Sequence, residues 1–294
     1  MRVVVFGYLG FQNFGDSLLL DAVLRNCADG SVVDVIQSGS LDEVMSHDNQ
    51  RRLKLTLRRA RTFEHFIAIL RADRVECIGG TCFHGRHSGF VLNQIMAAMT
   101  LKKITWNNVG FESDYRPTKW QRTVFRITCK KLTVRDPASA EIAMRTLGVE
   151  SDTKLDVGFE YGTLSTLFEE PTLKNIGIVL SPRTETNWRS DHLDVIRKLA
   201  FDHGFQPPEI VVLPAGPKDS RLSAKIAEDL GGRVLELDWM GQIAALKSAK
   251  IVVAERLHHH VVAAALGKQV FSVPYMEKNR TVLNAAGYSV QVLE

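Results

Sequence analysis

The sequence reads Ile251-Val252-Val253-Ala254-Glu255-Arg256-Leu257-His258-His259-His260 and continues into an alanine-rich run, residues 261–266. The four apolar residues predict a buried strand, the next two a turn, and the remainder a helix. In an open α/β sheet, ligands bind at the carboxyl ends of strands, where the next helix presents free backbone N–H groups. Arg256 and His258 would lie there, which indicates a site for an anion whose chemistry includes a proton transfer.

Short runs of apolar and β-branched residues alternate with helix-length segments along the whole chain, as is typical of parallel sheets covered on both faces. The alternation breaks at residues 161–175, a candidate linker. The sequence therefore predicts an α/β fold of two Rossmann-like domains, residues 1–165 and 166–294, whose parallel sheets face each other across a cleft. The runs expected as strands are 3–6, 32–37, 75–79, 104–109, 131–134, 176–180, 210–213, 233–235, 251–254 and 270–273.

The composition is that of an ordinary globular protein: 294 residues, 45% of them hydrophobic and 24% charged. A net charge of +4 does not argue for nucleic-acid binding. We expect no signal peptide, because glycines and Asp16 interrupt the apolar N-terminus. No apolar run approaches the ~20 residues of a membrane span, so any membrane contact would be peripheral. Four cysteines without paired spacing predict reduced thiols in a cytoplasmic protein: Cys27, Cys77, Cys82 and Cys129.

The loop after the first strand, Gly7 to Ser17, has the spacing of a phosphate-binding loop from Gly10 onward, but Asp16 stands where the lysine should be. A carboxylate there repels phosphate, so use of ATP or GTP is not expected. Asn13 and Asp16 could instead bind a sugar hydroxyl or act as a general base. The alternative is a tight turn with Asp16 or Ser17 capping the next helix.

Two further strand ends in the first half carry candidate site residues. Gly79-Gly80-Thr81 would let a ligand approach the backbone closely, or would form a plain turn. Arg135 could point into the cleft or lie along the surface, whereas Asp136 is expected to cap the following helix. His84 and His87 lack further ligands at a workable spacing, so no metal site is predicted.

In the second half, Ser181-Pro182-Arg183 ends a buried strand just as Arg256 follows another. Two arginines at one sheet edge could together bind a ligand with two anionic groups. Neighbouring residues on a helix do not share a face, so we expect only His258 of the three histidines to face the cleft. Lys278 could add a third cation.

Residues 51–74 interleave eight basic residues with apolar ones. Such a segment could dock on anionic lipid or on a lipid-linked phosphate. The alternative, which the hydrophobic pattern favours, is a core helix with a solvated basic face.

Together these motifs resemble the polysaccharide pyruvyltransferase family, and they run in the family's order along nearly the whole chain. The matching pieces are Gly7 to Asp16, Gly79-Gly80, Val134-Arg135-Asp136 with Ser139 and Leu147-Gly148-Val149, Ser181-Pro182-Arg183, Leu213-Pro214 with Asp219, Arg256-Leu257-His258, and Tyr275 with Lys278. The resemblance implies a GT-B-like pair of Rossmann domains. It also implies transfer of pyruvate from phosphoenolpyruvate to two hydroxyls of one sugar in an exopolysaccharide or cell-wall glycan repeat unit, forming a cyclic ketal.

On this hypothesis, His258 and Asp16 are the catalytic residues, and no metal or redox cofactor is needed. The sequence leaves open whether the saccharide acceptor is lipid-linked. A nucleotide-sugar glycosyltransferase of GT-B type, or a silent glycan-binding member of the family, are the alternatives. The donor-binding residues are Arg183, Arg256, Lys278 and Arg135, and the acceptor-binding residues are Asn13, Gly15, Gly79, Gly80 and Thr81.

Overall fold

The computed structural model of the chain divides into two compact units. Unit 1 consists of Met1–Gln12 and Asp16–Val157, and unit 2 consists of Asn13–Gly15 and Gly158–Glu294. The predicted boundary at 165/166 lies outside the described residues. The structure describes residues 1–39, 45–85, 87–88, 90–164, 173–183, 188, 190–273, 277–288 and 291–292, and of residues 87–88 and 277–279 only the backbone.

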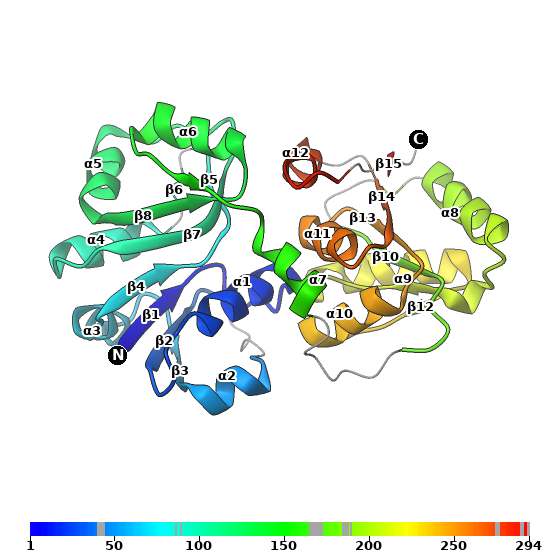
Figure 1. Cartoon of the computed structure of the whole chain (residues 1–294), viewed down its shortest axis with the longest axis horizontal. Coiled ribbons are helices and arrows are strands. Elements are labelled where there is room, and N and C mark those ends of the chain that lie inside the picture. Colours follow the sequence, from blue (N-terminus) through cyan, green and yellow to red (C-terminus); the bar gives the residue numbers. More distant parts are fainter. Residues whose placement is uncertain are drawn as a thin grey trace. The chain divides into compact units, whose positions relative to one another are not determined.

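Unit 1 is built on a mostly parallel sheet (Figure 1). Its path runs β3-β2-β1-β4-β7-β5-β6, while β8 pairs with β7 and β9 with β8; among the described strands of this sheet, only the short β5–β6 pairing is antiparallel. The order 3-2-1-4 follows from right-handed crossovers on either side of β1. The strands are β1 (Arg2–Phe6), β2 (Val32–Gln37), β3 (Lys54–Arg59), β4 (Arg74–Cys77), β5 (Gly80–His84), β6 (His87–Ser88), β7 (Ile104–Phe111), β8 (Cys129–Val134) and β9 (Asp152–Thr153).

The described residues of the first half of the chain form six helices, and several of these begin at side-chain caps. Thr118 and Gln121 form a reciprocal capping box at α5. Asp136 accepts a hydrogen bond from Ser139 N at α6, with Pro137 as the first helical residue, so its predicted capping role is confirmed. The helices are α1 (Phe14–Arg25), α2 (His47–Arg52), α3 (Phe63–Arg71), α4 (Val91–Met99), α5 (Lys119–Thr128) and α6 (Pro137–Leu147).

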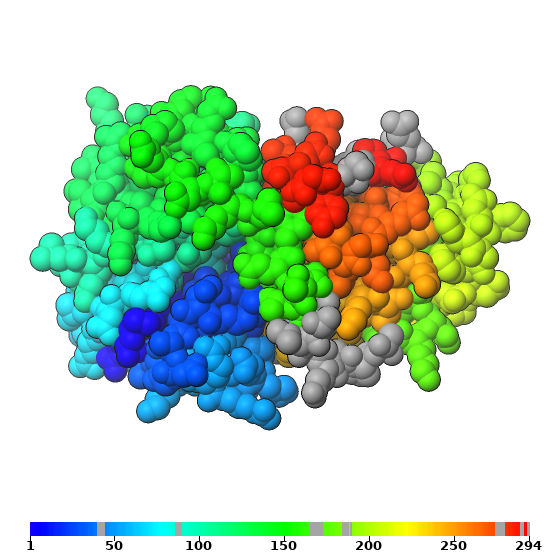
Figure 2. Space-filling model, viewed as in Figure 1, coloured from blue at the N-terminus to red at the C-terminus, as the bar shows by residue number. Residues whose placement is uncertain are grey.

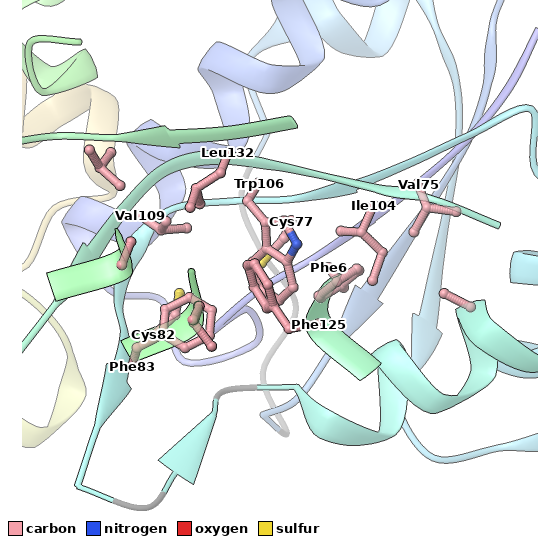
Figure 3. Packing of buried hydrophobic residues seen from close by; sticks show 14 of the residues in the cluster. Phe6, Val75, Cys77, Cys82, Phe83, Ile104, Trp106, Val109, Phe125 and Leu132 are labelled. Atoms are coloured by element: carbon pink, nitrogen blue, oxygen red, sulfur yellow. The ribbon is translucent and has the colours of Figure 1, made fainter. Parts of the chain in front are cut away.

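One hydrophobic core cluster of unit 1 lies between the sheet and α3 to α6. Aromatic rings fill its centre: Trp106 packs edge-on against Phe6 and is stacked with Phe125, whose ring also meets Phe83 (Figure 3). These side chains are almost fully buried.

Unit 2 has a fully parallel sheet in the order β12-β11-β10-β13-β14-β15, which is the 3-2-1-4-5-6 order of a doubly wound fold. Its strands are β10 (Ile178–Ser181), β11 (Ile210–Val212), β12 (Arg233–Val234), β13 (Ile251–Ala254), β14 (Gln269–Ser272) and β15 (Gln291–Val292). Its helices are α7 (Glu160–Leu164), α8 (Ser190–Asp202), α9 (Ser220–Leu230), α10 (Trp239–Ser248), α11 (Leu257–Ala265) and α12 (Glu277–Ala285). In the described part of the chain there are also three short 3-10 turns, η1 (Val157–Phe159), η2 (Pro207–Glu209) and η3 (Pro217–Asp219).

The predicted α/β class with two parallel sheets is confirmed, and each of the ten expected strands is present within a few residues of its predicted bounds. The interpretation of residues 51–74 as one helix is wrong, because they hold the end of α2, strand β3 and helix α3. β3 is an edge strand, and its charged residues suit such an edge because they discourage pairing with another chain. Among the described residues, no helix is long and apolar enough to cross a membrane.

Candidate functional site

The candidate site of unit 2 lies where the strand order reverses, between β10 and β13. These strands are neighbours, and Ser181 at the end of β10 is in register with Ala254 at the end of β13. The chain leaves β10 toward Arg183 and leaves β13 toward Arg256, so both arginines follow adjacent strands at one sheet edge. Ligands of open α/β sheets bind at such a point.

Glu255 ties the two strand ends together. Its side chain is 1% exposed, and Oε2 accepts hydrogen bonds from Arg183 N at 2.6 Å and from Trp188 Nε1 at 2.7 Å. Hydrogen bonds to a buried carboxylate are among the stronger ones in proteins. Glu255 therefore links the backbone at Arg183 to the turn that carries Arg256.

Arg256 is the N-cap residue of α11 and is held from one side by Asp219. Its Nη2 donates to Asp219 Oδ2 at 2.5 Å, and this carboxylate is fully buried between η3 and α9. The guanidinium has five N–H donors. Its Nε is buried and has no hydrogen-bond partner within the part of the chain that the structure describes. Asp219 thus orients the guanidinium while leaving donors for a ligand.

His258, in the first turn of α11, lies directly against Gly15. A Cβ on Gly15 would stand 2.0 Å from His258 Nδ1, which no real contact allows. Residues Asn13–Gly15 are grouped with unit 2, and Phe14 N donates to Ala215 O at 2.9 Å. Asn13 Oδ1 accepts from Gly15 N at 3.1 Å. Gly15 is therefore required by the close approach of a half-buried imidazole.

His259 is buried in a hydrogen-bonded row across three elements. Its Nδ1 lies 3.0 Å from Ser181 Oγ and its Nε2 2.8 Å from Gln242 Oε1, while its ring stacks on Phe14 at 4.2 Å. Gln242 donates with its amide nitrogen to Pro214 O, so its oxygen faces the ring. Nε2 must therefore donate, and Nδ1 accepts from Ser181. Burial, followed by the nearby positive charges, lowers the pKa of His259 well below its usual value.

His260 is also buried, and its Nδ1 lies 3.1 Å from the carbonyl oxygen of Arg256. Burial lowers its pKa to about 4. Two of the three consecutive histidines are therefore neutral packing residues, and of the three only His258 is not fully buried. Among the described residues, no group of three or more His, Cys, Asp or Glu side chains could hold a metal ion.

In unit 1, the structure brings Asp16, Gly80, Thr81 and Arg135 together at the carboxyl edge of the sheet. Arg135 Nη2 donates to Thr81 Oγ1 at 3.0 Å, and the guanidinium lies so close to Gly110 that a Cβ there would meet Nη2 at 2.6 Å. A Cβ on Gly80 would stand 3.6 Å from Asp16 Oδ1. Arg135, which is predicted to bind the donor, thus contacts Thr81, which is predicted to bind the saccharide acceptor.

Gly79 precedes β5 and Gly80 is its first residue, and β4 and β5 pair with successive parts of β7. Gly80 has φ +97°, and a Cβ on Gly79 would stand 2.2 Å from Asn108 O. Both glycines are therefore needed by the backbone, whatever they bind.

Tyr8 lies near the same carboxyl edge of unit 1. Burial, and then the charges of Cys82, Cys77 and Asp16, raise its pKa to about 12. Its hydroxyl therefore stays protonated at neutral pH and can donate a hydrogen bond.

Three residues singled out from the sequence cannot be placed. Tyr275 and the side chains of Lys278 and His87 lie outside the described residues. Conversely, sequence reasoning gave no role to Glu255, and it named Asp219 only within the family pattern. A signal was present for Asp219, since it closely follows β11 at the sheet edge that holds the arginines.

Solved structures with the same architecture include UDP-GlcNAc 2-epimerase from Neisseria meningitidis, at TM-score 0.61 and 10% identity over 100% of this chain and 88% of that one. A putative UDP-N-acetylglucosamine 2-epimerase from Listeria monocytogenes has TM-score 0.60 and 12% identity, covering 100% of this chain and 84% of that one. The enzyme from Methanocaldococcus jannaschii has TM-score 0.59 and 10% identity, covering 100% and 89%. These similarities show that the fold is of the GT-B type.

No curated protein matches the chain. A family model described as polysaccharide pyruvyl transferase matches residues 13–277, which is most of the sequence and includes both the Asp16 loop and the Arg256–His258 turn. The chain therefore belongs to the polysaccharide pyruvyl transferase family.

Proposed function

We propose that this protein transfers pyruvate from phosphoenolpyruvate to two hydroxyls of one sugar in an exopolysaccharide or cell-wall glycan repeat unit. The observation that carries the proposal is the carboxyl edge of unit 2. There Arg183 and Arg256 follow adjacent strands, and His258 stands in the first turn of α11. Family membership supports the transferase class.

Phosphoenolpyruvate carries a carboxylate and a phosphate, so it suits two guanidinium groups next to a helix N-terminus. Arg256 is already oriented by Asp219 and can form further hydrogen bonds to one anionic group. Arg183 projects from backbone that Glu255 holds. Preorganised donors lose little entropy on binding, so both arginines are suited to grip a small dianion.

The reaction needs one proton on C3 of phosphoenolpyruvate, and we assign that step to protonated His258. As C3 gains the proton, C2 becomes electrophilic and a sugar hydroxyl adds to it. The C2–O bond to phosphate then breaks, and a neighbouring hydroxyl closes the ketal at C2. Of the two hydroxyl protons, one replaces the proton that His258 gave up and the other leaves with phosphate.

We assign the sugar to the carboxyl edge of unit 1. Asp16 can accept a proton from a sugar hydroxyl, while Thr81 and the backbone at Gly79-Gly80 can bind neighbouring hydroxyls. Arg135 supports this edge through its hydrogen bond to Thr81. Asn13 and Gly15, also predicted to bind the acceptor, lie in one turn of the loop, where Asn13 Oδ1 accepts from Gly15 N and Gly15 lies against the imidazole of His258.

The proposal is tested by incubating the protein with phosphoenolpyruvate and an extracted glycan. We expect phosphate release that depends on the glycan, together with a new ketal methyl signal by NMR. A thermal-shift comparison of phosphoenolpyruvate with a panel of nucleotide sugars should show stabilisation by phosphoenolpyruvate alone. Stabilisation by a nucleotide sugar, without phosphate release from phosphoenolpyruvate, would refute the proposal in favour of a glycosyltransferase.

A further inference from the structure

Helices α3, α4 and α5 of unit 1 all end at the amino-terminal edge of its sheet. Each leads into a parallel strand, namely β4, β7 and β8, and these three strands are neighbours. The helices follow one another along one side of the unit (Figure 1). This edge is opposite to the carboxyl edge where Asp16, Thr81 and Arg135 lie.

Four large apolar side chains are exposed at these helix ends, and we call them the end cluster. They are Leu70 (46% exposed), Met99 (71%), Leu101 (91%) and Ile127 (54%). Leu101 has φ +55° immediately after the C-cap Thr100, a position that glycine or asparagine usually occupies. A leucine at this position has a strained backbone and an exposed side chain, so it does not stabilise the fold, and its presence calls for another explanation.

Two lysines hold the three helix ends together. Lys102 Nζ donates to Ala72 O, just after α3, at 2.5 Å. Lys103 Nζ donates to Ile127 O near the end of α5. The segment after α4 is therefore fixed to both neighbouring helix ends, and the end cluster belongs to one continuous part of the surface.

The charge around the end cluster is strongly positive. Segments 70–74, 99–104 and 126–131 contain one acidic residue, Asp73. Arg74 and Lys131 are paired with carboxylates, but the excess of positive charge remains. The basic residues are Arg71, Arg74, Lys102, Lys103, Arg126, Lys130 and Lys131.

We propose that the end cluster docks on an anionic lipid surface. Apolar side chains that project from a rim of lysines and arginines can enter the headgroup region while the cations contact lipid phosphates. The abundance of cations argues against a second copy of this surface, because two such rims would repel each other. Residues of this part of the chain, coloured between cyan and green, form the left margin of unit 1 in Figure 2. The inference does not depend on the proposed reaction.

The test is co-sedimentation of the full chain with vesicles of equimolar phosphatidylcholine and phosphatidylglycerol, compared with vesicles of phosphatidylcholine alone. We expect binding to the anionic vesicles that added salt reverses. Leu101→Gly should lower the partition coefficient about tenfold, because one leucine side chain is lost from the apolar contact. Glycine also suits φ +55°, so this variant should fold at least as well as the wild type.

Two further variants sharpen the test. Lys130→Gln should lower partitioning about fivefold through the loss of one surface cation, because Lys130 is exposed on β8 and belongs to the basic rim. Phe201→Ser is the matched control, since Phe201 is 84% exposed on α8 and should not affect partitioning. The inference is overturned if the wild type ignores anionic vesicles, or if Leu101→Gly partitions as the wild type does. It is also overturned if size-exclusion chromatography shows a dimer that Leu101→Gly dissociates, because the surface would then be a self-interface.

Discussion

Replacing Gly15 with alanine should separate catalysis from donor binding. The added methyl group would stand 2.0 Å from Nδ1 of His258, 2.7 Å from Cε1 and 2.8 Å from Cγ. An ordinary contact needs about 3.4 Å, so the imidazole must move by about 1.4 Å. A displacement of this size in a catalytic group typically costs about 100-fold in rate.

The assay is steady-state phosphate release at saturating glycan, with phosphoenolpyruvate varied. We expect kcat of Gly15→Ala to fall about 100-fold while KM for phosphoenolpyruvate changes little, because Arg183 and Arg256 keep their positions. Overpacking should also cost about 1–3 kcal/mol of stability, visible in urea denaturation.

Gly267→Ala provides the matched control at the opposite end of α11. Gly267 has φ +68°, and its Cβ would meet nothing within 4 Å. Alanine should cost about 1–2 kcal/mol there without touching the site, so kcat should stay at the wild-type value. Wild-type kcat in Gly15→Ala would refute the view that the imidazole must be held at this position. Equal losses in both variants would assign the effect to stability.

Asp219→Asn should raise KM for phosphoenolpyruvate about tenfold with a smaller change in kcat, because Arg256 loses its charged partner. An unchanged KM would show that Asp219 does not orient the guanidinium of Arg256. Thr81→Val should raise KM for the glycan but not for phosphoenolpyruvate, and the reverse pattern would move this residue to the donor. Burial lowers the pKa of both His65 and His260 to about 4, so between about pH 6.5 and that value the unfolded chain binds more protons than the folded one. The free energy of unfolding should therefore be highest above about pH 6.5 and fall as the pH is lowered, by at most about 3 kcal/mol for each histidine. Equal free energies of unfolding at about pH 7.5 and about pH 5 would contradict this.

The strands of both sheets could be predicted because buried parallel strands are continuous apolar runs, such as Ile251–Ala254. β3 was missed because an edge strand mixes charges with apolar residues, and basic residues 51–59 fit a helix equally well. β5 was not among the expected strands because it begins in the glycine pair Gly79-Gly80, which is typical of a turn, although β7 is long enough to pair with β4 and β5 in turn.

The candidate site was predicted less completely, because its contacts join residues distant in sequence. The turn at Arg256 could be recognised from one local pattern. By contrast, Gly15 and His258 are 243 positions apart in numbering, and nothing local shows that one must lack a side chain for the other to fit. The same holds for Asp219 with Arg256.

The central claim is that the carboxyl edge of unit 2 grips phosphoenolpyruvate through its arginines, while His258 acts in the chemical step. Calorimetric titration of phosphoenolpyruvate into wild type, Arg183→Gln, Arg256→Gln and His258→Gln tests it directly. We expect each arginine variant to bind about 10- to 100-fold more weakly, since a charge-assisted hydrogen bond is lost. His258→Gln should bind nearly as the wild type does and yet release no phosphate. Wild-type affinity in both arginine variants would contradict the claim.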